Sequence, residues 1–351
     1  RSRGLDQAML DRWPQTTEVW PLTSLQQGLG FESLALTDAA HDPYRVQLVL
    51  NLKGRVDAIR LESALKELIV RHEVLNLVFP AEMLERGLGI QQTQPLDWEV
   101  IVASEQELSS LIENDLHTPF DLEHGPLIRA RLIQTSSIDF HLIITNHHAL
   151  LDGWSMPIII SDLAALYRGE ILSPSLPWSE HLKWLAAQNN DSAKDYWVRH
   201  LQDQSASLIW SAGKAQSDKQ SDHNDPGQYI QRIPEKLSSS LALFARHQNL
   251  TIATVLQSLY ILLLARLSSR DEITIGVTRS GRNAERVGID RAVGFFISTM
   301  PFRAQVKLSQ PFIEWMRAMQ NEFAQQEEHL HLGLQQVQQL QIGRASCRER
   351  V

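Results

Sequence analysis

The feature that most constrains this chain is a largely apolar run, residues 140–144, that leads into two adjacent histidines. His147 and His148 follow it, and the pair Asp152-Gly153 then marks a turn. A short apolar run of this kind predicts a buried strand, which delivers the histidines to a loop. A rigid strand end holds a side chain in place and leaves it within reach of a substrate. The pattern therefore favours acid–base chemistry here.

Length and composition predict a globular protein with two lobes. The 351 residues exceed one ordinary core, and 43% hydrophobic with 21% charged residues is typical of soluble domains. A net charge of −8 without a dense Lys/Arg cluster argues against nucleic-acid binding. No apolar run approaches the roughly 20 residues that span a bilayer. The single cysteine excludes an internal disulfide and fits a reducing cytoplasm, so we expect a cytoplasmic protein.

Both ends of the chain indicate a piece of a longer sequence. The chain begins at Arg1 without a methionine, and residues 5–19 are polar with little periodicity, which predicts a linker. Residues 342–351 resemble the in-frame translation of a common sequencing adapter, with a natural basic tail as the alternative. We exclude them from the fold as a cloning scar would be excluded.

Hydrophobic periodicity in the first half predicts helices mixed with the strands of one sheet. The strands are expected over residues 46–52, 75–79, 98–102, 127–133 and 140–144, the last two paired through a turn at 135–139. The helices are expected from about 24, capped by Thr23 or Ser24, over 61–71, after a capping box at 104–107, and over 156–167.

A second lobe is predicted after Pro174, Ser175 and Pro177. Helices are expected through Trp184 and over 234–248, 251–267 and 312–328, with extended segments over 273–277 and 293–306. The polar stretch 211–227 predicts a long exposed loop. The helix at 251–267 is apolar nearly all round, which predicts burial. The fold class is therefore α/β (α+β).

We call residues 147–153 the histidine loop, and we expect its residues to have different roles. A histidine at a strand end is more often structural than catalytic, but here one of the pair can bind the loop while the other points into a cleft. A neutral imidazole near its ordinary pKa can take a proton from an amine or a hydroxyl. Asp152 needs a compensating charge if it is buried, and an arginine is the usual partner. Without a Ser or Cys nucleophile in an elbow context, direct group transfer is favoured.

These residues resemble a known family. His147-His148 with Asp152-Gly153 matches the HHxxxDG motif of the chloramphenicol-acetyltransferase-like superfamily, and Trp154-Ser155 resembles the condensation domain of nonribosomal peptide synthetases. Four further blocks resemble the family's motifs in its order: residues 21–28, residues 71–75, residues 196–197, and residues 280–282 with 293–301. The resemblance covers about residues 18–340 and departs from the family at Asn76, Gly30, Glu32 and Ser298. Asn76 bears on local stability more than on catalysis.

The resemblance implies two acetyltransferase-like lobes in a V-shaped arrangement, with the second lobe truncated. The expected domains are a linker from an upstream carrier domain at 1–17, the N-terminal lobe at 18–175, the incomplete C-terminal lobe at 176–340, and the adapter-derived tail at 341–351.

The resemblance also implies roles for individual residues. His148 is expected to be catalytic, and Gly153 to offer its backbone N–H to an oxyanion. Structural support is expected from His147 and Asp152, with Arg71 or Arg282 as the arginine that pairs with Asp152. Trp154, Ser155 and Ser298 are expected along a substrate channel, and Trp197 is expected to pack in the core.

The implied reaction is amide formation. The amine of an aminoacyl group on a downstream acceptor carrier attacks an acyl or peptidyl thioester on an upstream donor carrier. Both groups are tethered by 4'-phosphopantetheine, and an adenylation domain adjoins in the same polypeptide. We expect no bound cofactor, no metal and no membrane. Both histidines disfavour a heterocyclisation domain, and Trp154-Ser155 disfavours an epimerisation domain. A free-standing acyltransferase and a non-catalytic carrier-docking module stay as alternatives.

Overall fold

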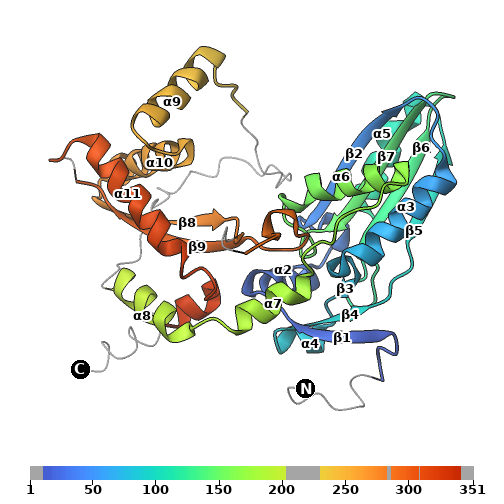
Figure 1. Cartoon of the computed structure of the whole chain (residues 1–351), viewed down its shortest axis with the longest axis horizontal. Coiled ribbons are helices and arrows are strands. Elements are labelled where there is room, and N and C mark those ends of the chain that lie inside the picture. The colour runs from blue at the N-terminus through green and yellow to red at the C-terminus, as the bar shows by residue number, and fades with distance from the viewer. Residues whose placement is uncertain (1–10, 203–229, 283–285, 308, 341–351) are drawn as a thin grey trace, which may run out of the picture. The chain divides into compact units, whose positions relative to one another are not determined.

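The computed structural model describes residues 11–202, 230–282, 286–307 and 309–340. The chain forms two compact units (Figure 1). The first consists of Arg1–Asn189, Thr278–Ser298 and Gly333–Gln335, and the second of Asn190–Val277, Thr299–Leu332 and Gln336–Val351. The predicted loop 211–227 and tail 341–351, and the first ten residues of the predicted linker, lie outside the described residues.

The boundary between these units differs from the one predicted after Ser175. Helix α7 (Trp178–Ala186) belongs to the first unit, because Trp178 and Leu182 pack in its core. Residues 278–298, expected in the second lobe, also belong to the first unit, since Ile289, Val293 and Phe295 join the same core. The division into acetyltransferase-like lobes stays a prediction.

A four-stranded sheet lies at the centre of the first unit. Its order is β2 (Arg45–Lys53), β7 (Asp139–His147), β6 (Ile128–Gln134) and β5 (Asp97–Val102). The predicted pairing of β6 with β7 is confirmed and antiparallel, as is the pairing of β2 with β7, whereas β5 runs parallel to β6. Strand β7 is therefore an interior strand, which fixes the position of its last residue, His147.

Helices cover both faces of this sheet. Helices α3 (Ala58–Arg71) and α6 (Ser155–Arg168) lie side by side over an apolar face that includes Leu132, Leu142 and Ile144 (Figure 1). Because side chains alternate along a strand, the neighbouring residues face α5 (Glu105–His117) instead. The predicted helices over 61–71 and 156–167 and the capping box at Ser104 are confirmed.

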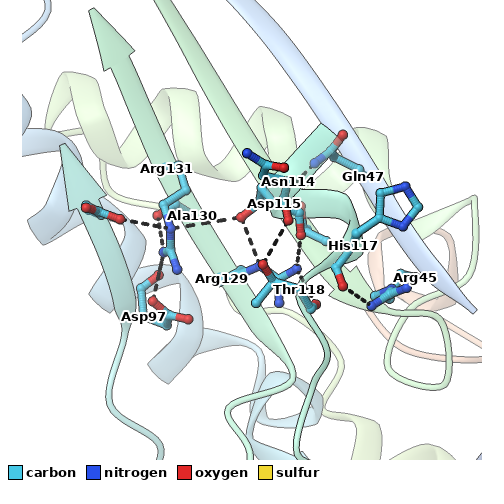
Figure 2. A network of polar contacts seen from close by, with 12 residues as sticks. Arg45, Gln47, Asp97, Asn114, Asp115, His117, Thr118, Arg129, Ala130 and Arg131 are labelled. Carbon is cyan, nitrogen blue, oxygen red and sulfur yellow. Dashed lines mark hydrogen bonds and ion pairs between the residues drawn. The ribbon is translucent and has the colours of Figure 1, made fainter. Parts of the chain in front are cut away.

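The contact between α5 and the sheet is a buried polar network (Figure 2). Asp115 accepts hydrogen bonds from Arg129 Nε at 2.9 Å, Gln47 Nε2 at 3.0 Å and Thr145 Oγ1 at 2.5 Å. Arg129 also lies over the Phe120 ring, 4.2 Å from its centroid. Since a buried charge is costly unless it is paired and hydrogen-bonded, these contacts fix α5 on the sheet beside the end of β7.

A second, smaller sheet begins inside the segment that was predicted to be a linker. Its order is β1 (Thr16–Pro21), β4 (Leu88–Gln92) and β3 (Leu77–Val78), and it lies beside α2 (Ser24–Ala35), which Thr23 caps as predicted, and α4 (Ala81–Glu85). The expectation of a linker up to residue 17 is wrong for its last residues, because Thr16 and Thr17 begin β1 and Trp13 packs on Val78 and Ile90. A polar strand with one buried tryptophan lacks the alternation that predicts a strand.

Short 3₁₀ helices occupy three turns of the first unit. They are η1 (Ala39–His41), η2 (Glu73–Asn76) and η3 (Ile289–Arg291). The strand predicted over 75–79 is therefore shorter than expected. At its start, Asn76 donates to the Ile69 carbonyl at 3.0 Å and accepts from the Gln94 N–H at 3.2 Å. Both ends of the buried amide are satisfied, so the fold accommodates the departure from the family at this position.

The second unit consists of helices around a two-stranded sheet. It contains α8 (Asn190–His200), α9 (Glu235–His247), α10 (Ile252–Ser268), α11 (Phe312–Glu327) and most of the paired strands β8 (Glu272–Arg279) and β9 (Ser298–Gln305). Its core includes Ile261, Phe302 and Phe323. The core packing predicted for Trp197 is confirmed, since its side chain is buried and its Nε1–H donates to the His329 carbonyl at 3.0 Å.

The burial predicted for the whole of α10 is wrong. Val255, Ile261 and Leu264 are buried, but Leu256, Leu259, Tyr260, Leu263 and Leu267 are exposed. The described elements pack on one face only, and composition does not reveal which face lacks a neighbour. No single described helix is long and apolar enough to cross a membrane; α9 and α10 meet that test only together, bent by 105°.

Candidate active site

The last residues of β7 place both histidines at the edge of the sheet. His147 pairs with Arg45 on β2, and its N–H donates to the Leu127 carbonyl at 2.9 Å. The N–H of His148 donates to the Tyr44 carbonyl at 2.7 Å. The two backbones are therefore held by neighbouring segments on either side.

His148 carries a proton acceptor that no described residue occupies. Its ring is half-buried and meets Phe295 edge to face, with 5.7 Å between the ring centroids. Its Nδ1 lies 2.8 Å from the Leu151 carbonyl, which can only accept, so Nδ1 carries the proton. In the neutral ring Nε2 then has a lone pair, and it has no hydrogen-bond partner among the described residues. This tautomer suits a general base.

His147 is enclosed by protein. The residue is 0% exposed, and its Nδ1 accepts from the Ala149 N–H at 3.3 Å. Its Nε2 lies 3.0 Å from Ser33 Oγ and 3.5 Å from Asp42 Oδ2. Burial and these contacts keep the ring of His147 away from any ligand.

Asp152 joins the histidine loop to a segment about 140 residues further along the chain. Its side chain is buried and accepts from the Ser155 N–H and hydroxyl, each at 2.8 Å, and from the Phe296 N–H at 3.1 Å. Its own N–H donates to the Gly294 carbonyl at 3.1 Å. These bonds satisfy a buried carboxylate and fix the turn that follows His148.

Arg282, one of the two predicted candidates, is the arginine beside Asp152. Its Nη2 lies 3.1 Å from Asp152 Oδ1, and its Nη1 donates at 2.8 Å to the carbonyls of both Ile289 and Ala292. The guanidinium also lies over the Phe296 ring, 4.1 Å from its centroid. Its side chain is only 5% exposed, so the ion pair is removed from solvent.

Arg71, the other candidate, lies elsewhere. Its Nε donates to Asp162 on α6 at 2.9 Å, and His72 Nε2 lies 3.0 Å from the same carboxylate oxygen. The structure therefore uses Arg71 to join α3 to α6, and it does not bring Arg71 to Asp152.

The three residues expected along a substrate channel have different surroundings. Trp154 is 60% exposed at the start of α6. Ser155 is fully buried, and its hydroxyl binds Asp152 and the Gly294 carbonyl, so it belongs to the anchored turn and does not line a channel. The hydroxyl of Ser298 is buried without a hydrogen-bond partner among the described residues.

Two glycines of the site are expected to respond differently to alanine. A Cβ at Gly153 would meet nothing within 4 Å, so Gly153→Ala is expected to change the unfolding free energy by less than about 0.5 kcal/mol. Gly281 has a φ of +64°, and a Cβ there would lie 1.9 Å from the Phe296 carbonyl oxygen. Gly281→Ala is therefore expected to cost more than about 1 kcal/mol. Urea unfolding of both variants checks this, and equal stabilities would contradict the geometry.

No sequence pattern identified the residues that contact the histidine loop from other segments. Gln26 is fully buried, and its Nε2 donates to the Ala149 carbonyl at 2.9 Å. Ser33, Asp42 and Tyr44 complete this set through the contacts described above. Each is an ordinary polar residue in sequence, although Gln26 falls within the block 21–28 that resembles the family.

Two other buried histidines make stability sensitive to pH. Burial lowers the pKa of His72 to about 4 and that of His181 to about 3, against 6.5 in the unfolded chain. Between the folded pKa and the unfolded pKa, the histidine binds a proton in the unfolded chain but not in the folded chain. The free energy of unfolding is therefore highest above pH 6.5 and falls as the pH drops below that value.

His181→Phe is expected to remove part of this loss. The slope approaches about 1.4 kcal/mol per pH unit between the folded and unfolded pKa values, but the unfolded histidine is only half protonated at pH 6.5. The wild type should therefore lose about 1.6 kcal/mol per histidine from pH 6.5 to 5. Phenylalanine keeps an aromatic ring beside Trp178 and Phe296 and does not titrate. It also removes the acceptor of Arg286 Nη1, so the variant is compared by its pH slope and not by its stability at one pH. Urea unfolding at the two pH values measures the difference, and an unchanged pH slope in the variant would contradict the assignment.

The described residues contain no group of three or more His, Cys, Asp or Glu side chains arranged to hold a metal ion.

Comparison with known proteins identifies the family. The sequence matches the family model described as Condensation domain over residues 16–349. The chain belongs to the condensation domain family. The match includes residues 341–349, which resemble adapter sequence and lie outside the described residues. The family is of the acyl-transferring condensation type.

The curated relatives are much longer synthetases. The chain is 31% identical over 338 residues to tyrocidine synthase 2 of Brevibacillus parabrevis, an alignment that covers 92% of this chain and 9% of that protein. The chain thus spans less than a tenth of that relative. The predicted resemblance to a condensation domain of nonribosomal peptide synthetases, including those that make antibiotics, is confirmed.

Solved structures share the fold. The X-domain in complex with OxyB from teicoplanin biosynthesis matches with a TM-score of 0.77 and 22% identity, covering 92% of this chain and 73% of that chain. The first condensation domain of the calcium-dependent antibiotic synthetase, in complex with a substrate analogue, matches with a TM-score of 0.67 and 18% identity, covering 91% and 76%. The predicted α/β fold class is confirmed as that of these condensation-domain structures.

Proposed function

We propose that this chain forms an amide bond between two carrier-bound groups. The amine of an aminoacyl thioester on an acceptor carrier attacks the carbonyl carbon of an acyl or peptidyl thioester on a donor carrier. A C–N bond forms, the C–S bond breaks, and the donor carrier is left with a free thiol. The 4'-phosphopantetheine arms belong to the carriers, which are the substrates, and the adenylation domain that loads a carrier adjoins in the same polypeptide.

The observation that carries this proposal is the ring of His148. Its Nδ1–H donates to the Leu151 carbonyl, which leaves Nε2 to accept a proton. In the proposed reaction Nε2 takes the proton from the attacking amine and passes it to the departing thiolate. A base of this kind contributes about 10²–10⁴-fold to a rate, and proton balance requires one because the product amide nitrogen has lost a proton.

Gly153 is proposed to stabilise the oxyanion. Its N–H has no acceptor among the described residues, the residue is exposed, and a methyl group would have open space around it. A backbone N–H held by the Asp152 turn can donate to negative charge without reorganising, which is how such donors lower a barrier. Asp152, Arg282 and His147 are proposed to hold this arrangement.

Two other functions make different predictions. A free-standing acyltransferase of the same superfamily would accept a soluble thioester as donor. A non-catalytic docking module would bind a protein without transfer; the X-domain whose fold this chain shares is described in complex with the protein OxyB. The open Nε2 of His148 favours catalysis over docking alone, because a docking module needs no proton acceptor at this position.

Donor type separates these possibilities. The chain is mixed with an acceptor carrier that bears an aminoacyl group. The donor acyl group is supplied either on a carrier or on pantetheine alone, and each arm is repeated with a panel of amino acids on donor and acceptor. We expect amide product only, or at least about tenfold faster, with the carrier-bound donor, because binding energy from the carrier orients the thioester. Equal rates would favour the free-standing acyltransferase, and no product with any pair would favour the docking module.

A further inference from the structure

We infer that Asp42 is a positioning residue that sets both histidines of the site, His147 through its ring and His148 through its backbone. The inference rests on the proposed function and extends it to a carboxylate that the sequence patterns did not single out.

One carboxylate reaches both histidines. The Asp42 side chain is 9% exposed, and its Oδ2 lies 3.5 Å from His147 Nε2. Its Oδ1 accepts from the Tyr44 N–H at 2.8 Å, and the Tyr44 carbonyl in turn accepts from the His148 N–H at 2.7 Å. Asp42 thus contacts the ring of His147 directly and is connected to the backbone of His148 through Tyr44.

The carboxylate also selects the tautomer of His147. The Ala149 N–H donates to Nδ1, so the proton of the neutral ring is on Nε2, where Ser33 Oγ at 3.0 Å and Asp42 lie. Burial raises the pKa of Asp42, but hydrogen bonds from His147, the Tyr44 N–H and Ser33 outweigh this and hold its pKa below the ordinary value. Asp42 is therefore ionised and can only accept. An amide at this position would offer a donor to the Nε2–H and oppose that tautomer.

The segment that carries Asp42 is itself fixed. Arg45 donates to the His117 carbonyl at 3.0 Å (Figure 2). Arg45 also donates to the Ala40 carbonyl, and His117 Nδ1 donates to the same carbonyl at 3.0 Å. These bonds join η1 to the end of α5, which the buried Asp115–Arg129 pair holds on the sheet. A rigid support of this kind is what a positioning residue requires.

Asp42→Asn tests the inference. Asparagine keeps an oxygen for the Tyr44 N–H but replaces the acceptor beside His147 with an amide donor. We expect kcat for amide formation between loaded carriers to fall about 10- to 100-fold, in line with other residues that orient a functional histidine, while KM for both carriers stays within about twofold. Because a smaller folded fraction would also lower the apparent kcat at constant KM, the rates are divided by the folded fraction that circular dichroism gives for each variant.

Asp121→Asn is the matched control. Asp121 also accepts backbone N–H groups, from Glu123 and His124, and pairs with a histidine ring, His124 Nδ1 at 2.9 Å, but its side chain is 58% exposed. We expect its kcat and KM to equal those of the wild type. Equal kcat values for Asp42→Asn and Asp121→Asn would overturn the inference.

A readout without substrate makes the test independent of the proposed function. With ¹⁵N-labelled histidine, the His147 ring in the wild type is expected to show a protonated Nε2 and an unprotonated Nδ1, and Asp42→Asn is expected to lose this single tautomer. Unchanged ring signals would overturn the inference even if the chain forms no amide. If Asp42→Asn does not fold, Ser33→Ala serves as the second variant. It removes the hydroxyl beside Nε2 but keeps the Asp42 carboxylate, so the single tautomer of His147 is expected to persist. Loss of that tautomer in Ser33→Ala would assign it to Ser33 and overturn the inference.

Discussion

Replacing His148 with alanine is expected to lower the rate of amide formation by about 10²–10⁴-fold in single turnover, the share that a positioned general base contributes. The fold should be retained, because the ring is only half-buried and its hydrogen bond to the Leu151 carbonyl, its one side-chain bond within the described segments, is worth about 1 kcal/mol. Rapid-quench measurement with preloaded donor and acceptor carriers gives the rate, and circular dichroism checks the fold.

His124→Ala is the control for this prediction. His124 is an exposed histidine of the same unit whose ring pairs with Asp121 in its own turn, so loss of the ring should leave the rate unchanged. If His148→Ala keeps more than about a tenth of the wild-type rate while His124→Ala is normal, His148 is not the base.

Arg282→Ala is expected to destabilise the first unit by about 3–5 kcal/mol. The substitution leaves the buried Asp152 carboxylate without its compensating charge, and removing one partner of a buried ion pair costs about this much. It also removes the donors to the Ile289 and Ala292 carbonyls. Because the chain has two units, amide hydrogen exchange of the β7 backbone is the suitable measurement, since it reports the opening of the unit that contains the pair.

Two further variants identify the cause. Arg291→Ala removes an arginine of the same segment that is 66% exposed, and it should change stability by less than about 0.5 kcal/mol. Combining Arg282→Ala with Asp152→Ala removes the orphaned charge as well, so the double variant should lose less than the sum of the two single variants. Additive losses, or an Arg291→Ala effect as large as that of Arg282→Ala, would contradict the ion-pair account.

Local patterns in the sequence predicted the part of the site that lies within a few residues of the histidines. The apolar run before His147 predicted β7, and the Asp152-Gly153 pair predicted the turn before α6. These predictions succeed because strand burial and turn chemistry depend on neighbours along the chain. The same reasoning predicted that Asp152 needs an arginine, since the cost of a buried charge does not depend on the fold.

Contacts between distant segments could not be predicted in this way. Asp152 and Arg282 are separated by 130 residues, and nothing in sequence distinguished Arg282 from Arg71. Strand β1 was missed because its residues are mostly polar and its partner, β4, lies about 70 residues further on. The exposed face of α10 was missed because apolar composition predicts burial without specifying a neighbour. Asp42 carried no signal because its role depends on a folded loop.

The most direct test of the central claim is the mass of the two carriers after incubation with the chain. The donor carrier is loaded with an acyl-aminoacyl group and the acceptor carrier with an aminoacyl group, and intact-protein mass spectrometry follows both. We expect the acceptor to gain the mass of the acyl-aminoacyl group, the donor to return to its free thiol, and neither change to occur with the His148→Ala chain. Loss of the donor group without a matching gain on the acceptor, or equal transfer by the wild-type and His148→Ala chains, would contradict the account.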